Sequence, residues 1–100
     1  MGYDEHYAGS KEAGSVASID YVEDGIAQTV KEVPAEKVIN AIPFYTRIWE
    51  TTGDGISSQA VDMVTAEQFI SNHGITAEWD ETTCQNYGEY TSGDSRYQVW

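Results

Sequence analysis

The sequence predicts an α/β segment in its first half and an α+β segment in its second half. A helix pattern spans about residues 19–33, and strand-like runs lie on either side of it, at 1–7 and 38–45. This strand, helix, strand order is that of a βαβ unit. After Trp49 the chain becomes rich in turn-forming residues that separate short strand patterns, which is typical of hairpins in an antiparallel sheet.

The predicted helix follows a small, polar loop at residues 8–17. Ser18 or Asp20 can cap it, and Glu23 stands three residues after Asp20, as in a capping box. Five apolar residues recur at three- and four-residue steps: Ile19, Val22, Ile26, Val30 and Val33. This spacing places one apolar stripe on a helix of about four turns, which Pro34 is expected to end.

The run "VINAIPFY" at residues 38–45 is short, β-branched and almost continuously apolar. Such a run is typical of a strand that is buried on both faces of a sheet. Together with the run at 1–7, it predicts a parallel strand pair joined by a right-handed crossover through the helix.

Beyond Trp49, "ETTGDGISS" predicts a loop at residues 50–58. Thr65 can cap a short helix over residues 66–73, which Gly74 would close. Three strand-like runs follow, "ITAEWD", "TTCQNYGEY" and "RYQVW". Their short connections predict an antiparallel sheet that accompanies this helix.

The composition limits the class of protein. One hundred residues make one domain or a piece of one. The 17 acidic and 5 basic residues give a net charge of -12, which repels phosphate backbones and anionic lipid heads. We therefore expect neither nucleic acid nor membrane as a partner. An apolar fraction of 40%, with 12% aromatic residues, argues against disorder.

The sequence gives no sign of a metal ion or of an organic cofactor, and we expect neither. Cys84 is the single cysteine, so it can form no intrachain disulfide and no cysteine cluster. His6 and His73 are far apart in sequence and belong to no metal motif. We expect Cys84 to be a half-buried strand residue.

Four segments carry a resemblance to a known family: "MGYDEHY", "NAIPFYTRIW", "EWDETTCQNY" and "YQVW". Taken together they resemble glycoside hydrolase family 18, and more closely its bacterial spore-cortex and cell-wall members, which cleave N-acetylglucosamine-containing glycans. The first, second and fourth segments are similar to barrel strands six, seven and eight, and the third is similar to a hairpin of an inserted domain. Ala41 departs from the glycine that usually precedes "IPFY".

The resemblance implies a partial TIM barrel, made of strands six to eight and one helix, at residues 1–49 and 96–100. It implies a small antiparallel α+β insertion domain at residues 50–95. Both ends of the chain lie on strand-like patterns, which predicts a segment of a larger fold. Bare strand edges would then favour a homodimer or a strand-swapped oligomer.

In this family a glutamic acid protonates the glycosidic oxygen and the N-acetyl group of the substrate attacks the anomeric carbon, an exception to the two-carboxylate rule. That glutamate closes a D-x-x-D-x-D-x-E motif, which this sequence lacks. We therefore assign no catalytic residue and expect no activity from this chain by itself. The parent would be a glycosidase of the extracellular space, cell wall or spore, acting on chitin or peptidoglycan.

The resemblance also implies six substrate-binding residues: Met1, Tyr3, Asp4, Tyr45, Arg47 and Trp100. Tyr3 would bind the N-acetyl group, and Trp100 would form the floor on which a sugar ring stacks. Arg47 would bind sugar oxygens or pair with Asp4.

Plainer interpretations stay open beside these. Without the resemblance, Tyr3 and Asp4 would belong to an exposed tail, and Trp100 would be a core residue. Trp79 and Tyr87 would form a cross-strand aromatic pair, with a sugar platform as the alternative. The whole chain could instead be a non-catalytic carbohydrate-binding domain, or a structural or interaction domain.

Overall fold

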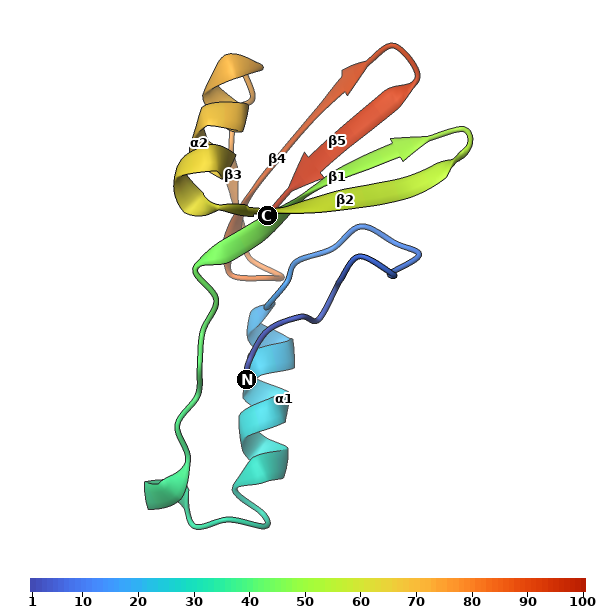
Figure 1. Ribbon diagram of the computed structural model, residues 1–100. Helices are drawn as coiled ribbons and strands as arrows, with labels where there is room; N and C mark the ends of the chain where they lie inside the picture. Colours follow the sequence, from blue (N-terminus) through green and yellow to red (C-terminus); the bar gives the residue numbers. More distant parts are fainter.

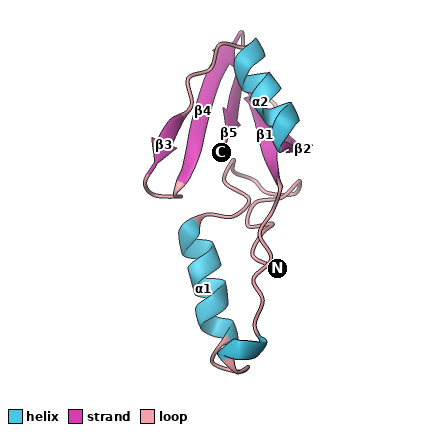
Figure 2. Cartoon of the chain, turned by 90° about the vertical axis from the view of Figure 1, so that its left-hand side faces the viewer, coloured by secondary structure: helices cyan, strands magenta, loops and turns pink.

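The computed structural model describes all 100 residues. The elements, in chain order, are α1 (Ile19–Thr29), the 3-10 helix η1 (Ala35–Lys37), β1 (Tyr45–Thr52), β2 (Gly55–Asp62), α2 (Met63–Asn72), β3 (Glu78–Asp80), β4 (Gln85–Ser92) and β5 (Ser95–Val99). The sheet and α2 form one tier, and α1 with its connection to β1 forms a second tier below it (Figures 1 and 2). The radius of gyration is 15.2 Å, whereas a compact domain of this length has about 13 Å. The molecule is therefore elongated.

The sheet has five strands in the order β2-β1-β5-β4-β3, and every neighbouring pair is antiparallel. Two-residue turns at 53–54 and 93–94 join β1 to β2 and β4 to β5. Gly93 has a φ of 59°, a left-handed conformation that glycine adopts at low cost. Such short turns fix the register of a hairpin. The antiparallel sheet with hairpins and one helix, predicted for the second half, is confirmed, but the predicted loop at 50–58 is a hairpin.

Helix α2 covers one face of the sheet through an aromatic cluster. Phe69 lies with its ring centroid 5.9 Å from that of Tyr90 and 5.8 Å from that of Tyr97. Tyr90 and Tyr97 are directly opposite each other on neighbouring strands and stack at 4.9 Å. Ala66 is the buried residue of this helix.

The two ends of α2 have distinct caps. The carboxylate of Asp62 accepts a hydrogen bond from the backbone N–H of Thr65 at 2.7 Å, so the cap is Asp62 and not Thr65 as predicted. This contact lowers the pKa of Asp62. Gly74 follows the helix with a φ of 62°, which confirms the predicted C-terminal glycine.

Trp49 is the centre of the small core on the other face of the sheet. Its side chain is 1% exposed, and its indole N–H donates to the backbone oxygen of Gly14 at 3.0 Å. His6 meets the indole edge to face, with ring centroids 6.4 Å apart. The loop that contains Gly14 and the buried Val16 therefore covers this face.

The predicted parallel strand pair does not form, so that prediction is wrong. Residues 1–7 and 38–44 run side by side in the same direction, but a single backbone hydrogen bond joins them, from Gly2 to Ala41 at 2.9 Å. Regular strand structure begins only at Tyr45. A parallel pair needs covered faces and further strands beside it, and neither is present here.

The last strand also differs from the prediction. Residues 97–100 were expected to run parallel to residues 38–45, but β5 lies antiparallel between β1 and β4. The tight turn after β4 explains this, because a two-residue connection allows only antiparallel pairing. The sheet thus continues across both predicted domain boundaries, and the division into barrel and insertion stays a prediction.

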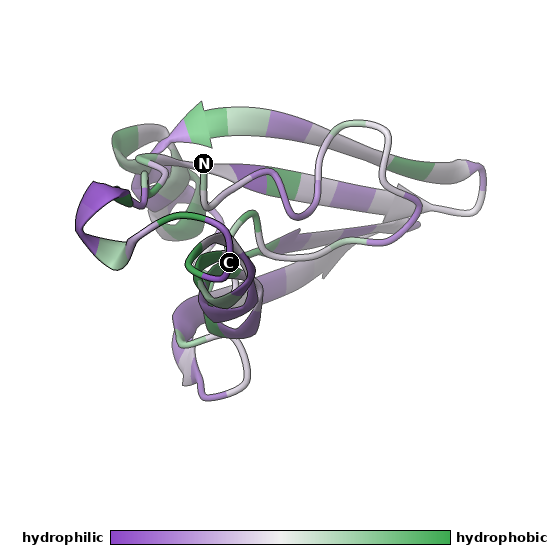
Figure 3. Ribbon diagram, turned by 90° about the horizontal axis from the view of Figure 1, so that it is seen from below, coloured by the Kyte–Doolittle hydropathy of each residue, from purple (hydrophilic) through white to green (hydrophobic).

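Helix α1 begins after Ser18, as predicted, but ends at Thr29, before the last residues of the apolar stripe. None of its residues is buried. Figure 3 views the molecule from this end and shows hydrophobic segments among the hydrophilic ones of the lower tier. The apolar stripe of α1 is half-buried at Ile19 and Val22 and exposed at Ile26.

Candidate functional site

The N-terminal segment meets the first residue of β1. The rings of Tyr3 and Tyr45 are perpendicular, with centroids 6.0 Å apart. The Tyr45 hydroxyl donates a hydrogen bond to the carboxylate of Asp4. Asp4 has a φ of 64°, a left-handed conformation that is costly for a residue with a side chain. Backbone strain of this kind gathers at functional sites, which makes this contact a candidate site.

The surroundings of Tyr45 keep its hydroxyl protonated. Burial, followed by the hydrogen bond to Asp4 and the negative charge of that carboxylate, raises the pKa of Tyr45 to about 12. The positive charge of Arg47 acts in the opposite direction, which places Arg47 within electrostatic reach of the phenol. The phenol therefore stays protonated, and able to donate a hydrogen bond, up to a higher pH than an ordinary tyrosine.

Arg47 shares the β1 face with Tyr45 and Trp49, because side chains alternate along a strand. Its Nη1 donates to the hydroxyl of Ser58 at 2.9 Å. Its Nε is buried and has no hydrogen-bond partner. No ion pair joins it to Asp4, and its other predicted role, the binding of sugar oxygens, stays a prediction. An orphaned buried donor is costly, and an incoming oxygen atom would satisfy it.

Trp100 lies on the same face of the sheet as Arg47. The register pairs Trp49 with Gln98, and Trp100 follows Gln98 by two residues, directly after the end of β5. Its ring packs against that of Tyr87, with centroids 4.7 Å apart. Its backbone oxygen accepts a hydrogen bond from the Thr46 hydroxyl at 2.7 Å.

Met1 is not brought to the other five predicted residues. It is 82% exposed. It lines a separate cavity of about 240 Å³ together with Tyr21, Ile26 and Val38. The structure thus gathers Tyr3, Asp4, Tyr45 and Arg47 around the start of β1, with Trp100 on the neighbouring strand.

Two residues of the "DEHY" segment hold the candidate site in place. The carboxylate of Glu5 accepts hydrogen bonds from the backbone N–H of Ser18 at 2.7 Å and from its hydroxyl at 2.9 Å. The Nδ1 atom of His6 lies 2.7 Å from the backbone oxygen of Ser15. These contacts tie the chain next to Asp4 to the start of α1.

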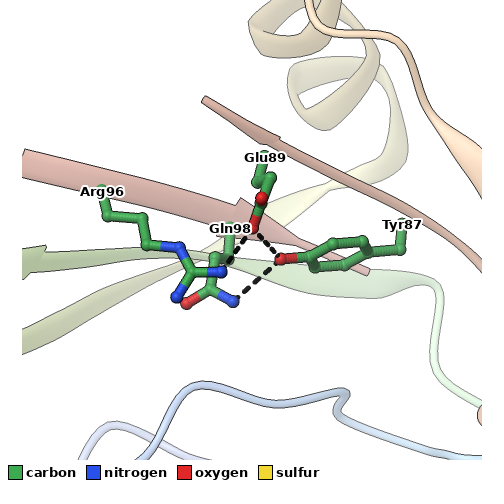
Figure 4. Close-up of polar contacts among 4 residues, drawn as sticks. All are labelled: Tyr87, Glu89, Arg96 and Gln98. Carbon is green, nitrogen blue, oxygen red and sulfur yellow. Dashed lines mark hydrogen bonds and ion pairs between the residues drawn. The ribbon is translucent and has the colours of Figure 1, made fainter. Parts of the chain in front are cut away.

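A polar cluster that the sequence reasoning missed lies on the same face (Figure 4). The Tyr87 hydroxyl donates to Glu89 at 2.5 Å and accepts from Gln98 at 2.9 Å. Arg96 forms an ion pair with Glu89 at 2.6 Å. Burial first, and then the bond to Glu89, raises the pKa of Tyr87, whereas Tyr87 and then Arg96 lower the pKa of Glu89. The sequence offers one signal for this cluster. Tyr87 and Glu89 are two residues apart in one strand-like run, and Arg96 and Gln98 are two residues apart in the next.

The side chains and helices of the molecule also bear on metal binding and on membrane insertion. No three side chains of His, Cys, Asp or Glu come close enough together to hold a metal ion. No helix has the length and apolar character that crossing a membrane requires.

No protein-family model matches the chain, and no curated protein matches it. Its structure is similar to several solved crystal structures, among them the following three. A chitinase from Chromobacterium violaceum ATCC 12472 has a TM-score of 0.84 and 29% identity, covering 100% of this chain and 31% of that one. A protein named as a sporulation-specific glycosylase, ydhD of Bacillus subtilis, has a TM-score of 0.83 and 25% identity, covering 100% and 34%. The spore cortex-lytic enzyme SleL of Bacillus megaterium QM B1551 has a TM-score of 0.76 and 19% identity, covering 100% and 23%.

The chain spans between 23% and 34% of the length of these proteins. Its fold is that of one piece of a larger chitinase-like or glycosylase-like protein, and the relation rests on fold at low sequence identity.

Proposed function

We propose that this chain forms part of the substrate-binding wall of a family 18 glycoside hydrolase that acts on N-acetylglucosamine-containing glycans. Residues 1–49 and 96–100 would belong to a partial TIM barrel, and residues 50–95 to the inserted domain. The similarity in fold to a chitinase and to a spore cortex-lytic enzyme supports a chitin or peptidoglycan substrate. Such polymers occur in cell walls, spores and the extracellular space, which is where we place the protein.

One observation carries the proposal: the meeting of Tyr3, Asp4 and Tyr45 at the start of β1. Two phenol rings and a carboxylate offer stacking surface together with hydrogen-bond donors and acceptors. These are the groups that bind the apolar faces and polar edges of a sugar. Arg47 adds a donor that lacks a partner within the chain.

The roles within this wall follow the resemblance. Tyr3 would hold the N-acetyl group, Asp4 and Arg47 would bind sugar oxygens, and Trp100 would support the sugar ring. The sequence supplies no proton donor at the required spacing, so the chain by itself would bind glycan without cleaving it. Met1 would join the wall only if the lower tier rearranged.

The test is a titration of the isotope-labelled chain with N-acetylated chitotetraose, followed by two-dimensional NMR. We expect saturable shifts at Tyr45, Arg47 and Trp100 and no shortened sugar in the mixture by mass spectrometry. An Arg47→Lys variant, which keeps the charge but loses the Nε donor, should bind more weakly. Cleavage of the sugar would contradict the proposed inactivity, and unchanged spectra would contradict the wall.

A non-catalytic binding or interaction domain is the alternative. It is favoured by one observation, namely that β1–β5 and α2 form a complete antiparallel sheet with a covering helix. The two functions differ in whether the chain works as part of a larger enzyme that supplies the catalytic glutamic acid. Activity that appears when the chain is joined to a segment with the D-x-x-D-x-D-x-E motif would favour the enzyme, and its absence would favour the domain.

A further inference from the structure

We propose that the groove between α2 and the β3–β4 end of the sheet is a second sugar-binding site, which takes a neutral N-acetylated pyranose. The groove has a volume of about 330 Å³, which lies within the range of small-molecule sites. It opens on the sheet face that α2 covers, whereas Arg47 and Trp49 lie on the opposite face. Trp100 also lines the groove, so the two proposed sites meet at this residue, and they differ in Trp79 on one face and Arg47 on the other.

Trp79 supplies the stacking surface of this groove. It lies on the three-residue edge strand β3 and is 57% exposed, although it lines the groove. The register places Asn86 directly opposite Trp79 on β4. An indole face beside an amide gives a sugar both an apolar platform and a partner for its hydroxyl groups.

The floor of the groove is apolar and already formed. Ala66 is 5% exposed and Val99 is 3% exposed, and both line the groove. Gly88 lies beside them, and a Cβ atom at that position would be 2.6 Å from a methyl carbon of Ile75. The methyl group of an N-acetyl substituent would pack on such a floor.

The charges around the groove select against an acidic ligand. Glu67 is the only ionisable side chain in the lining, and the chain carries a net charge of -12. The remaining polar lining includes the uncharged amide of Asn86, whereas the Gln85 amide accepts a hydrogen bond from the Ser15 hydroxyl. A neutral sugar therefore fits better than a carboxylate-bearing one. The choice of an N-acetylated sugar rests on the proposed function, whereas the site itself does not.

The three indole N–H signals in an NMR titration with N-acetylated chitotriose test this inference. We expect the Trp79 signal to shift saturably, while the buried Trp49 signal stays in place as a measure of intact folding. Trp79→Ala should weaken binding at Asn86 by about tenfold or more, and Trp79→Tyr, which keeps an aromatic ring, should stay within about threefold of the original.

Several outcomes would overturn the inference. One is a Trp79 signal that does not move at saturating sugar, and another is unchanged affinity at Asn86 in Trp79→Ala. A third is equally tight binding of tri-galacturonate, which would exclude a neutral preference. Shifts at Arg47 without shifts at Trp79 would overturn only this second site. Shifts at Trp79 without shifts at Arg47 would count only against the substrate wall.

Discussion

The Tyr45 hydroxyl donates a hydrogen bond to the carboxylate of Asp4, and this contact joins two residues that lie 41 positions apart in the chain. Few other side-chain contacts link the N-terminal segment to the sheet, so this pair helps to fix where that segment lies. The pair is also the centre of the proposed substrate wall. Its removal should therefore affect both stability and glycan binding.

Tyr45→Phe removes the hydroxyl and leaves the ring against Tyr3. We expect a loss of about 0.5–1.5 kcal/mol in the free energy of unfolding, the usual net contribution of one hydrogen bond. Urea denaturation followed by far-UV circular dichroism measures it. Tyr7→Phe is the matched control, because Tyr7 is 57% exposed and its hydroxyl has no partner. Equal losses in the two variants would contradict a specific role for Tyr45.

The same contact predicts a dependence on alkaline pH. The pKa of Tyr45 is raised from 10.0 to about 12, by burial and by Asp4. The folded state thus favours the neutral phenol, so its contribution is complete below pH 10.0 and is lost as the pH rises through about 12. The stability difference between the original chain and Tyr45→Phe should shrink over that interval. A difference that stays constant up to pH 12 would contradict the assignment.

The left-handed backbone at Asp4 can be tested separately from its hydrogen bond. Asp4→Gly and Asp4→Ala both lose the carboxylate, but only glycine adopts a φ of 64° without strain. We expect Asp4→Ala to be less stable than Asp4→Gly by about 1–2 kcal/mol in urea denaturation. Equal stabilities would mean that Asp4 leaves this conformation when its side chain is lost.

The parts of the fold that could be predicted are those that depend on nearby residues. Gly74 and Gly93 mark a helix end and a hairpin turn, and both do so through a positive φ that the sequence makes probable. Cys84 was expected in a strand, but it is an exposed turn residue with a φ of 54°. The register of β3 was also mispredicted. Trp79 faces Asn86, so it lies on the opposite sheet face from Tyr87.

The candidate site was only partly predictable, because its residues are far apart in the sequence. The meeting of Tyr3, Asp4 and Tyr45 followed from the resemblance, since no local pattern links residues so far apart. The ion pair between Arg96 and Glu89 depends on the register of β4 and β5, which spacing alone does not fix. The parallel strands failed for a further reason, because their formation depends on neighbours that the chain does not supply.

Trp49 should be the residue on which stability depends most. Trp49→Phe keeps a ring in the core but leaves the Gly14 carbonyl without its donor, which should cost about 1–3 kcal/mol. Trp49→Ala should cost about 3–5 kcal/mol, because it also opens a cavity. Trp79→Phe, at an exposed position, should change stability by less than about 0.5 kcal/mol. Equal effects of Trp49→Phe and Trp79→Phe in urea denaturation would contradict this account of the core.

The connection before β1 predicts self-association. This connection, residues 38–44, exposes three large apolar side chains: Ile39 (92%), Ile42 (61%) and Phe44 (81%). Its backbone forms one hydrogen bond with residues 1–7. Unpaired extended backbone beside apolar side chains favours pairing with a second copy. The net charge of -12 on each copy opposes this contact, so added salt should strengthen it.

Light scattering at rising protein concentration should therefore show a homodimer or a strand-swapped oligomer, with more of it in high salt than in low salt. Replacing both Ile39 and Phe44 by serine should give a monomer under all these conditions. Val64→Ser is the matched control, because Val64 is 65% exposed and lies on α2, outside residues 38–44, and it should leave the oligomer intact. A monomer in high salt at high concentration would show that this apolar segment does not need a second copy to cover it.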